Sequence, residues 1–389
     1  MNIAVFVKST TYHHGYGGLE TQNKTLCEGL AKRGHRITVF SPKRELDVPS
    51  KDENGVSYIF IPSVYRLGLF NNKNNWVNRS YEKFKELHEK EKFDLVLSQS
   101  SAGLGVIRRK QELEIKVVSV SHGTILGELK TKFKNITSFK DALRSAPDLI
   151  FSMRVFFGRQ RDFIHGSNKV IAVSNAVKKA LLEETFVDEN KVEVVHNGID
   201  PSMFSQRPGK YGKVHLIYLG RVIRSKGVIL LVEMIKDLNC ILDVVGNGDD
   251  MDAMRREAEG LGISQKVVLH GQIPPDQVAG SLLRSDIFVF PTLRMEGLPM
   301  VLVEAMFSGL PIVAFDMGGV GDAVEDGVNG FLLKEDDVGG FKARLNELIE
   351  SADLRFQMSQ ASIDRAHKEF TVENMAAKYE NIFMEVITQ

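Results

Sequence analysis

The sequence predicts an α/β protein with two doubly wound domains. Its 389 residues exceed the length of one ordinary domain, and strand-like apolar runs alternate with helical patterns in both halves. Runs rich in Val, Ile and Leu between helices are typical of parallel sheets that are covered on both faces. The turn-forming residues that place the join near residues 200–213 are Pro201, Pro208, Gly209 and Gly212. Two such domains leave a cleft in which ligands bind at the carboxyl ends of the strands.

In the first half, strands are expected from the first residues onward. Helical patterns separate several of them, for example at residues 18–33 and 76–90. The expected strands cover residues 3–7, 36–41, 57–62, 94–99, 116–122, 169–174 and 192–197.

The second half repeats this alternation, and after Gly340 the pattern is helical to the end. Its expected strands cover residues 215–221, 240–246, 267–271, 287–291, 311–315 and 330–333. We therefore expect an N-terminal domain over residues 1–205 and a C-terminal domain over residues 206–370. A last helix over residues 371–389 is expected to cross back to the N-terminal domain.

Composition indicates a soluble globular protein, with 43% apolar and 26% charged residues. No uncharged apolar run reaches the roughly 18 residues of a transmembrane helix. The chain begins with a strand and lacks a basic segment and a cleavage site, so no secretory signal is expected. Cys27 and Cys240 lie far apart without metal-ligand spacing, which favours reduced core thiols in a cytosolic protein.

The formal net charge of zero hides a basic half and an acidic half. Residues 1–205 hold 31 Lys and Arg against 23 Asp and Glu, and residues 206–389 hold 19 against 27. The first half is therefore expected to meet an anionic partner. The strongest basic patch contains Lys130, Lys132, Lys134, Lys140, Arg144, Arg154, Arg159 and Arg161. Aromatic residues lie among these cations, so the patch fits either an anionic membrane surface or a solvated helix, and both interpretations remain open.

The sequence lacks two common nucleotide-binding motifs. Gly15 and Gly17 are followed by Glu20 where a dinucleotide fingerprint needs a third glycine, and Val245-Gly-Asn-Gly248 fails in the same way. Ser225-Lys226-Gly227 lacks the upstream glycine of a phosphate-binding Walker loop. A hydride-transferring dehydrogenase and a Walker-type NTPase are therefore disfavoured.

The most informative stretch runs from Glu296 to Glu304. It follows the expected buried strand that Pro291 ends, and apolar residues at helical spacing begin at Leu298, with Pro299 in the first turn. Glu296 is then expected in the loop at the strand's carboxyl end and Glu304 about two turns into the helix. Free amides at a helix start favour an anion such as a phosphate. Carboxylates on either side of that phosphate could accept hydrogen bonds from the diols of a sugar and a ribose.

Other polar residues also follow expected strands. Gly220 and Arg221 end the first strand of the second half, and Lys226 with Gly227 opens the next helix. Two cations beside a glycine loop suit a diphosphate, with about 1.5–3 kcal/mol for each charge-assisted hydrogen bond. His122 ends a strand in the first half; a lone histidine of this kind is as often structural as functional.

These residues resemble glycosyltransferase family 4, retaining sugar-nucleotide transferases of the GT-B fold with two Rossmann-like domains that face a cleft. The resemblance covers essentially the whole chain. Glu296 and Glu304, with seven residues between them, match the family's most specific motif. Other segments that resemble the family are Gly17-Gly18, Asn197-Gly-Ile-Asp200, Gly318-Gly319 and Asp326-Gly-Val-Asn-Gly330. Val320-Gly321-Asp322 departs from the family, in which a Pro-Glu pair is commoner.

The resemblance also implies roles for individual residues. It assigns His122 and Glu296 to the donor sugar, Gly220, Arg221 and Lys226 to the diphosphate, and Gly17 and Gly18 to an acceptor- and phosphate-side loop. The Gly297 and Leu298 amides would bind the phosphate, Glu304 the ribose, and Gln272 and Ile273 the nucleobase. Catalysis would depend on His122, Arg221, Lys226 and Glu296.

The expected activity is retaining transfer of a hexosyl unit from a UDP- or GDP-sugar to a glycan, glycolipid or lipid-linked acceptor. No metal or other cofactor is expected, because the cations can stabilise the leaving diphosphate and no Asp-x-Asp pair at a strand end suggests a metal site. Two alternatives remain: an inactive nucleotide-sugar-binding regulator or partner subunit, and a nucleotide-sugar epimerase.

The expected location is cytoplasmic, peripheral on the cytoplasmic face of a membrane, with residues 130–161 as the contact. No nucleic-acid partner is expected. Neither the donor sugar nor the acceptor is fixed by a motif.

Overall fold

The structure is a computed structural model that describes residues 1–13, 17–46, 48–63, 75–134, 156–204 and 212–389. The described part of the chain divides into two compact units. Unit 1 comprises Met1–Lys130, Ile136–Gly198 and Val372–Gln389, and unit 2 comprises Thr131–Asn135 and Ile199–Thr371. Half of the turn-rich join predicted near residues 200–213, residues 205–211, lies outside the described residues.

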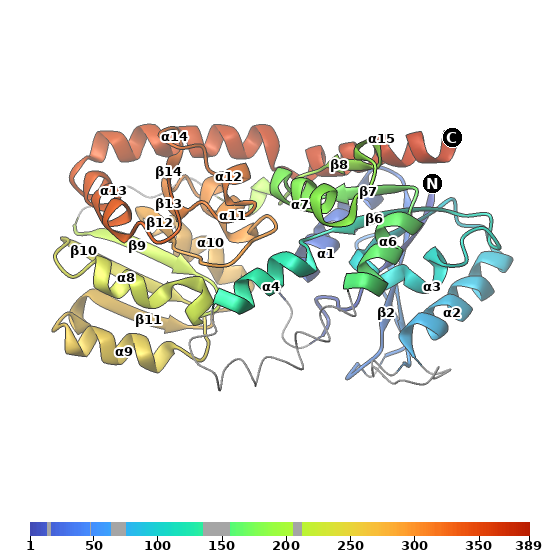
Figure 1. Cartoon of the computed structure of the whole chain (residues 1–389), viewed down its shortest axis with the longest axis horizontal. Coiled ribbons are helices and arrows are strands. Elements are labelled where there is room, and N and C mark those ends of the chain that lie inside the picture. Colours follow the sequence, from blue (N-terminus) through green and yellow to red (C-terminus); the bar gives the residue numbers. More distant parts are fainter. Residues whose placement is uncertain (14–16, 47, 64–74, 135–155, 205–211) are drawn as a thin grey trace. The chain divides into compact units, whose positions relative to one another are not determined.

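Unit 1 is built on a sheet with strand order β3-β4-β2-β1-β5-β6-β7-β8 (Figure 1). Among the described strands, neighbours pair in parallel except β3 and β4, which are antiparallel. The strands are β1 (Asn2–Phe6), β2 (Arg36–Pro42), β3 (Ser50–Glu53), β4 (Val56–Ile61), β5 (Leu95–Gln99), β6 (Lys116–Ser121), β7 (Lys169–Ala172) and β8 (Val192–Val194).

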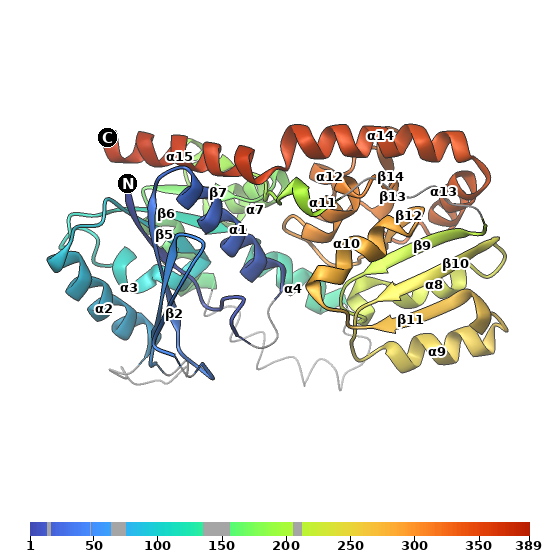
Figure 2. The same cartoon turned by 180° about the vertical axis from the view of Figure 1, so that it is seen from behind.

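Helices cover both faces of this sheet, with α2 and α3 on one face (Figure 1) and α1 on the other (Figure 2). The helices of unit 1 are α1 (Gly18–Lys32), α2 (Trp76–Lys90), α3 (Leu104–Ile107), α6 (Arg161–Gly166), α7 (Asn175–Thr185) and the C-terminal α15 (Val372–Thr388). Helix α4 (Ile125–Lys134) belongs to unit 1 as far as Lys130 and to unit 2 from Thr131. Shorter helical turns are η1 (Ser100–Gly103), η2 (Phe156–Gln160) and η3 (Glu189–Lys191).

Unit 2 is built on a wholly parallel sheet with strand order β11-β10-β9-β12-β13-β14. The strands are β9 (Val214–Leu219), β10 (Cys240–Val245), β11 (Val267–Gly271), β12 (Ile287–Phe290), β13 (Ile312–Phe315) and β14 (Gly330–Leu333). Because β12, β13 and the middle of β9 are buried on both faces, they need the continuous apolar runs that the sequence shows.

Helices α8 and α9 lie on one face of the second sheet (Figure 1), and α10 lies on the opposite face (Figure 2). The helices of unit 2 are α8 (Val228–Met234), α9 (Met251–Gly260), α10 (Pro275–Leu283), α11 (Met300–Phe307), α12 (Val320–Ala323), α13 (Val338–Glu350) and α14 (Ala352–Glu369), with turns η4 (Pro201–Met203), η5 (Arg224–Lys226) and η6 (Ser264–Lys266). No helix of the described ranges is long and apolar enough to cross a bilayer.

The predicted fold class, two doubly wound α/β domains with helices at the C-terminal end, is confirmed. Each predicted strand occurs, with ends displaced by at most three residues. Strand β3 was not predicted, because Ser-Lys-Asp-Glu has neither apolar character nor alternation and forms a strand only by pairing with β4. Helix α11 begins at Met300, two residues later than the apolar spacing suggested.

The C-terminal helix α15 packs on α1 within unit 1. A Cβ added at Gly29 of α1 would lie 2.8 Å from Cγ2 of Val372 and 3.4 Å from Cβ of Ala376. The helices can approach this closely because Gly29 has no side chain, so the last residues of the chain belong to the core of the first sheet's unit.

We expect Gly29→Leu to lower the free energy of unfolding of unit 1 by about 1–3 kcal/mol, because the side chain overpacks the α1–α15 contact. Trp76, the only tryptophan, is buried in unit 1 and reports its urea unfolding by fluorescence. Gly123→Leu is the control, since a Cβ at the exposed Gly123 meets nothing within 4 Å. Equal urea midpoints for the two variants would contradict this account of α15.

Candidate functional site

The second sheet changes its winding direction between β9 and β12. From β9 the chain winds outward to β10 and β11, whereas from β12 it winds the other way to β13 and β14. Ligands of doubly wound sheets bind at the carboxyl ends of strands at such a point. The loops that leave these two strand ends, residues 220–227 and 291–299, carry most of the residues that the sequence proposed for the donor.

Backbone hydrogen bonds fasten these loops together. The N–H of Leu293 donates to the carbonyl of Ser225 (3.0 Å), and the N–H of Gly319 donates to the carbonyl of Glu296 (2.9 Å). Gly227 and Gly318 have positive φ angles of 67° and 66°. A Cβ at either would collide with backbone, at Pro291 and at Glu296 respectively. Only glycine permits this approach, so the backbone around Glu296 is fixed from both sides.

The Glu296 carboxylate is held through one of its two oxygens. Lys226 Nζ donates to Oε1 at 2.6 Å, and Thr292 Oγ1 donates to the same oxygen at 2.9 Å. The side chains of Lys226 and Glu296 are only 14% and 13% exposed. Burial lowers the pKa of Lys226, and the Glu296 carboxylate opposes that shift. The structure thus joins two residues that lie 70 positions apart in the chain.

Two free amides follow Glu296. In the described part of the chain, the backbone N–H groups of Gly297 and Leu298 have no hydrogen-bond partner. They lie just before α11, whose first residue is Met300. Unpaired amides beside a lysine suit a phosphate group.

Glu304 lies within α11, and its carboxylate has no hydrogen-bond partner among the described residues. Burial raises its pKa to about 7. A partly buried carboxylate without a partner is costly, which is the state expected of a group that accepts hydrogen bonds from a ligand.

The remaining donor-side residues lie along the same edge of the sheet. Gly220 adopts a φ of +151° directly after β9, and the neighbouring Arg221 is exposed. The buried Tyr218 hydroxyl donates to the Arg221 carbonyl at 2.7 Å and fixes this turn. Gln272 and Ile273 follow β11, two strands from β9, which corresponds to about 10 Å at the usual strand spacing.

In unit 1, His122 follows β6 and forms a chain of polar contacts. Its Nε2 lies 2.7 Å from Gln99 Oε1, and Gln99 Nε2 donates to Asn23 Oδ1 at 3.0 Å. Burial lowers the pKa of His122 to about 4, so the ring is neutral at pH 7. Since Gln99 Oε1 can only accept, the proton is on Nε2 and Nδ1 is left as an acceptor.

Gly17 and Gly18 begin α1 in unit 1. The chain itself supplies an anion there, because the N–H of Gly17 donates to Glu20 Oε2 at 2.9 Å. The preceding His14, Gly15 and Tyr16 lie outside the described residues. So does most of the predicted basic patch; of its cations, the structure describes the side chains of Lys130, Arg159 and Arg161.

Sequence reasoning missed the residues that hold the functional side chains. The missed residues are polar and lie in or next to buried strands: Thr292, Tyr218 and Gln99. A polar residue at such a position in the sequence would have indicated each of them. Arg294 was also missed; its Nε lies 3.8 Å from Glu296 Oε1.

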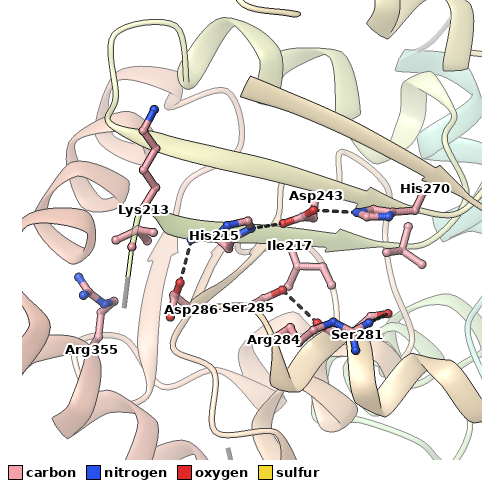
Figure 3. A pocket seen from close by; sticks show the side chains of 13 residues that line it. Lys213, His215, Ile217, Asp243, His270, Ser281, Arg284, Ser285, Asp286 and Arg355 are labelled. Carbon is pink, nitrogen blue, oxygen red and sulfur yellow. Dashed lines mark hydrogen bonds and ion pairs between the residues drawn. The ribbon is translucent and has the colours of Figure 1, made fainter. Parts of the chain in front are cut away.

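A separate cavity of about 430 Å³ lies against β9, β10, β11 and α10 (Figure 3). Asp243 binds two histidines there, His215 through Nδ1 at 2.6 Å and His270 through Nε2 at 2.7 Å. None of the residues proposed from the sequence lines this cavity. In the close view its lysine and arginine side chains do not converge on one point.

We expect the stability of the ligand-free protein to fall by about 2 kcal/mol between pH 5.5 and pH 8.5 because of Glu304. Its folded-state pKa of about 7 lies above the value of an unfolded glutamate, so its protonated form stabilises the fold at low pH. That contribution is lost as pH rises through 7. Thermal unfolding of wild type and Glu304→Gln at several pH values tests this, with Glu233→Gln on the exposed face of α8 as control. Parallel pH curves for wild type and Glu304→Gln would contradict the assignment.

Comparison with known proteins identifies the family. The family model described as Glycosyltransferase Family 4 matches residues 16–203, and the model described as Glycosyl transferases group 1 matches residues 203–365. The chain is 26% identical over 396 residues to an uncharacterized glycosyltransferase of Methanocaldococcus jannaschii, with 95% of each chain covered.

Further relatives have named activities. The chain is 23% identical to UDP-Gal:alpha-D-GlcNAc-diphosphoundecaprenol alpha-1,3-galactosyltransferase of Escherichia coli, covering 86% of this chain and 85% of that one. Among solved structures it resembles Anabaena HepE in complex with UDP, with a TM-score of 0.76, 17% identity and 99% and 100% of the two chains covered. At this identity the likeness shows the fold, which is GT-B. The chain belongs to glycosyltransferase family 4.

Proposed function

We propose that the enzyme transfers a hexosyl unit, with retention of anomeric configuration, from a UDP- or GDP-sugar to a lipid-linked or glycan acceptor. The observation that carries the proposal is the buried Lys226–Glu296 pair beside the unpaired Gly297 and Leu298 amides, at the switch point of the second sheet. A diphosphate and a hexose are the ligands whose charge and hydroxyl groups fit this arrangement.

In the proposed reaction, the bond between the anomeric carbon and the diphosphate breaks, and a bond to the acceptor oxygen forms on the same face of the sugar. The acceptor's proton passes to the leaving phosphate oxygen. Negative charge grows on that diphosphate, and Lys226, Arg221 and the two amides stabilise it. Glu296 positions the hexose through its hydroxyl groups. His122 is proposed, from the family resemblance, as a further group that contacts the hexose.

We propose that transfer needs no added metal ion. Two cations and two amide dipoles offset the negative charge of the diphosphate. In other nucleotide-dependent enzymes a divalent metal ion offsets this charge. The proposed role of Glu304 is to accept hydrogen bonds from the ribose diol. Its pKa of about 7 then makes nucleotide binding tighter at pH 8 than at pH 6.

The acceptor is proposed from charge and from relatives. The first half of the chain carries a net charge of +8, and the Escherichia coli relative named above acts on a diphosphoundecaprenol-linked sugar. We therefore propose that this enzyme works at the cytoplasmic face of a membrane, with residues 130–161 as the contact.

Lys226→Ala is expected to lower kcat/KM by about 10- to 100-fold, because one charge-assisted hydrogen bond to the diphosphate is lost. A thermal-shift screen of UDP-, GDP- and ADP-sugars in EDTA first identifies the donor; at 100 times its Kd a donor stabilises the fold by about 2.7 kcal/mol. Transfer is then assayed with that donor. Arg224→Ala, which removes an exposed cation two residues away, is the control.

Three outcomes would count against the proposal. No shift with any donor in a folded sample would indicate that none of these sugar nucleotides binds, and would favour an inactive scaffold. Interconversion of the donor sugar without transfer would indicate an epimerase. Wild-type turnover in Lys226→Ala would remove that residue from the mechanism.

Charge reversal at Lys130, Lys132 and Lys134 is expected to weaken binding to vesicles that contain anionic lipid. Each cation near such a surface contributes about 1 kcal/mol, so sedimentation with vesicles should fall steeply. Reversal of Lys83, Lys85 and Lys90 on α2 is the matched control. Equal loss in both variants, or unchanged binding, would contradict a membrane contact at residues 130–134.

A further inference from the structure

The Glu296 carboxylate is bound asymmetrically. Its Oε1 atom accepts from Lys226 Nζ and from Thr292 Oγ1, at 2.6 and 2.9 Å. Its Oε2 atom has no hydrogen-bond partner among the described residues. Two donors on one oxygen fix the plane of the carboxylate and leave the lone pairs of the other oxygen for a ligand.

Thr292 can act on a ligand only through Glu296. Its side chain is fully buried, and it lies in the loop that follows Pro291, just after β12. Its hydroxyl donates to Glu296 and is a distant acceptor, at 3.4 Å, for the Arg294 N–H. A buried hydroxyl whose one proton is used in this way has none left to bind substrate.

Arg294 competes for the same carboxylate. Its Nε lies 3.8 Å from Glu296 Oε1 and is buried without a hydrogen-bond partner among the described residues. Arginine pairs best with a carboxylate through two parallel hydrogen bonds that engage both oxygens. With Oε1 held by Lys226 and Thr292, Arg294 does not form that pair in this structure.

We propose that Thr292 is a positioning residue for the transfer reaction. Its hydroxyl keeps Glu296 out of a two-oxygen pair with Arg294 and so keeps Oε2 available to the hydroxyl groups of the donor hexose. This inference rests on the proposed function of Glu296, and it adds a residue that touches neither donor nor acceptor.

The test compares Thr292→Val, which removes the hydroxyl and keeps the shape, with Thr292→Ser, which retains the hydroxyl. Thr292→Val should lower kcat by about 10- to 100-fold, the effect of one hydrogen bond to a charged group. Its affinity for UDP or GDP, whichever nucleotide wild type binds, should stay within about twofold, because the nucleotide does not touch Glu296. Thr292→Ser should keep near wild-type kcat.

A second substitution tests the part of Arg294. If a two-oxygen pair between Arg294 and Glu296 causes the low kcat of Thr292→Val, adding Arg294→Met to that variant should raise kcat, although it removes a cation. Wild-type kcat in Thr292→Val, or parallel losses of kcat and nucleotide affinity, would overturn the proposal. So would a kcat in the double variant no higher than in Thr292→Val. Absence of transfer by wild type with every donor would instead overturn the proposed function itself.

Discussion

The donor side of this enzyme depends on how closely two backbone segments approach the loop after β12. Gly227 lies against the carbonyl of Pro291, and Gly318 lies against the backbone of Glu296. Both glycines have positive φ, and no other residue type fits the space without a shift of the backbone. Because the loop is held on both sides, Glu296 and the amides after it are placed before any ligand arrives, which is what electrostatic stabilisation of a leaving group requires.

The charges gathered there are not balanced within the protein. Lys226 and Glu296 neutralise each other, whereas Arg221 and Arg294 lie in the same loops, and the partly buried Glu304 carboxylate has no partner among the described residues. Among the described residues, unit 2 thus keeps two unpaired amides, an exposed arginine and a carboxylate without a partner in the loops and helix that follow β9 and β12. The partly buried carboxylate is unfavourable in the free protein, and under the proposed function the ribose of the donor supplies its missing partner.

The positions of the strands and the chemistry of the site differ in how far the sequence predicts them. The continuous apolar runs, such as Ile287–Phe290, and the glycines after them sufficed to predict the strands and the loops that follow. A strand of a parallel sheet is covered on both faces, so its residues are apolar at successive positions and the run is easy to recognise. Local patterns could not predict β3, which depends on pairing with β4. They also could not pair Lys226 with Glu296 or place Thr292 beside it, since these contacts depend on β9 and β12 being neighbours.

The central claim is that unit 2 recognises the diphosphate of a sugar nucleotide through Lys226 and the Gly297 and Leu298 amides. Calorimetric titration of UDP, UMP and uridine, and of the guanosine series, into the metal-free protein tests it most directly. In one of the two series the diphosphate should bind at least about tenfold more tightly than the monophosphate, the effect of one further charge-assisted hydrogen bond. Equal affinities for the diphosphate and the monophosphate in both series would contradict it.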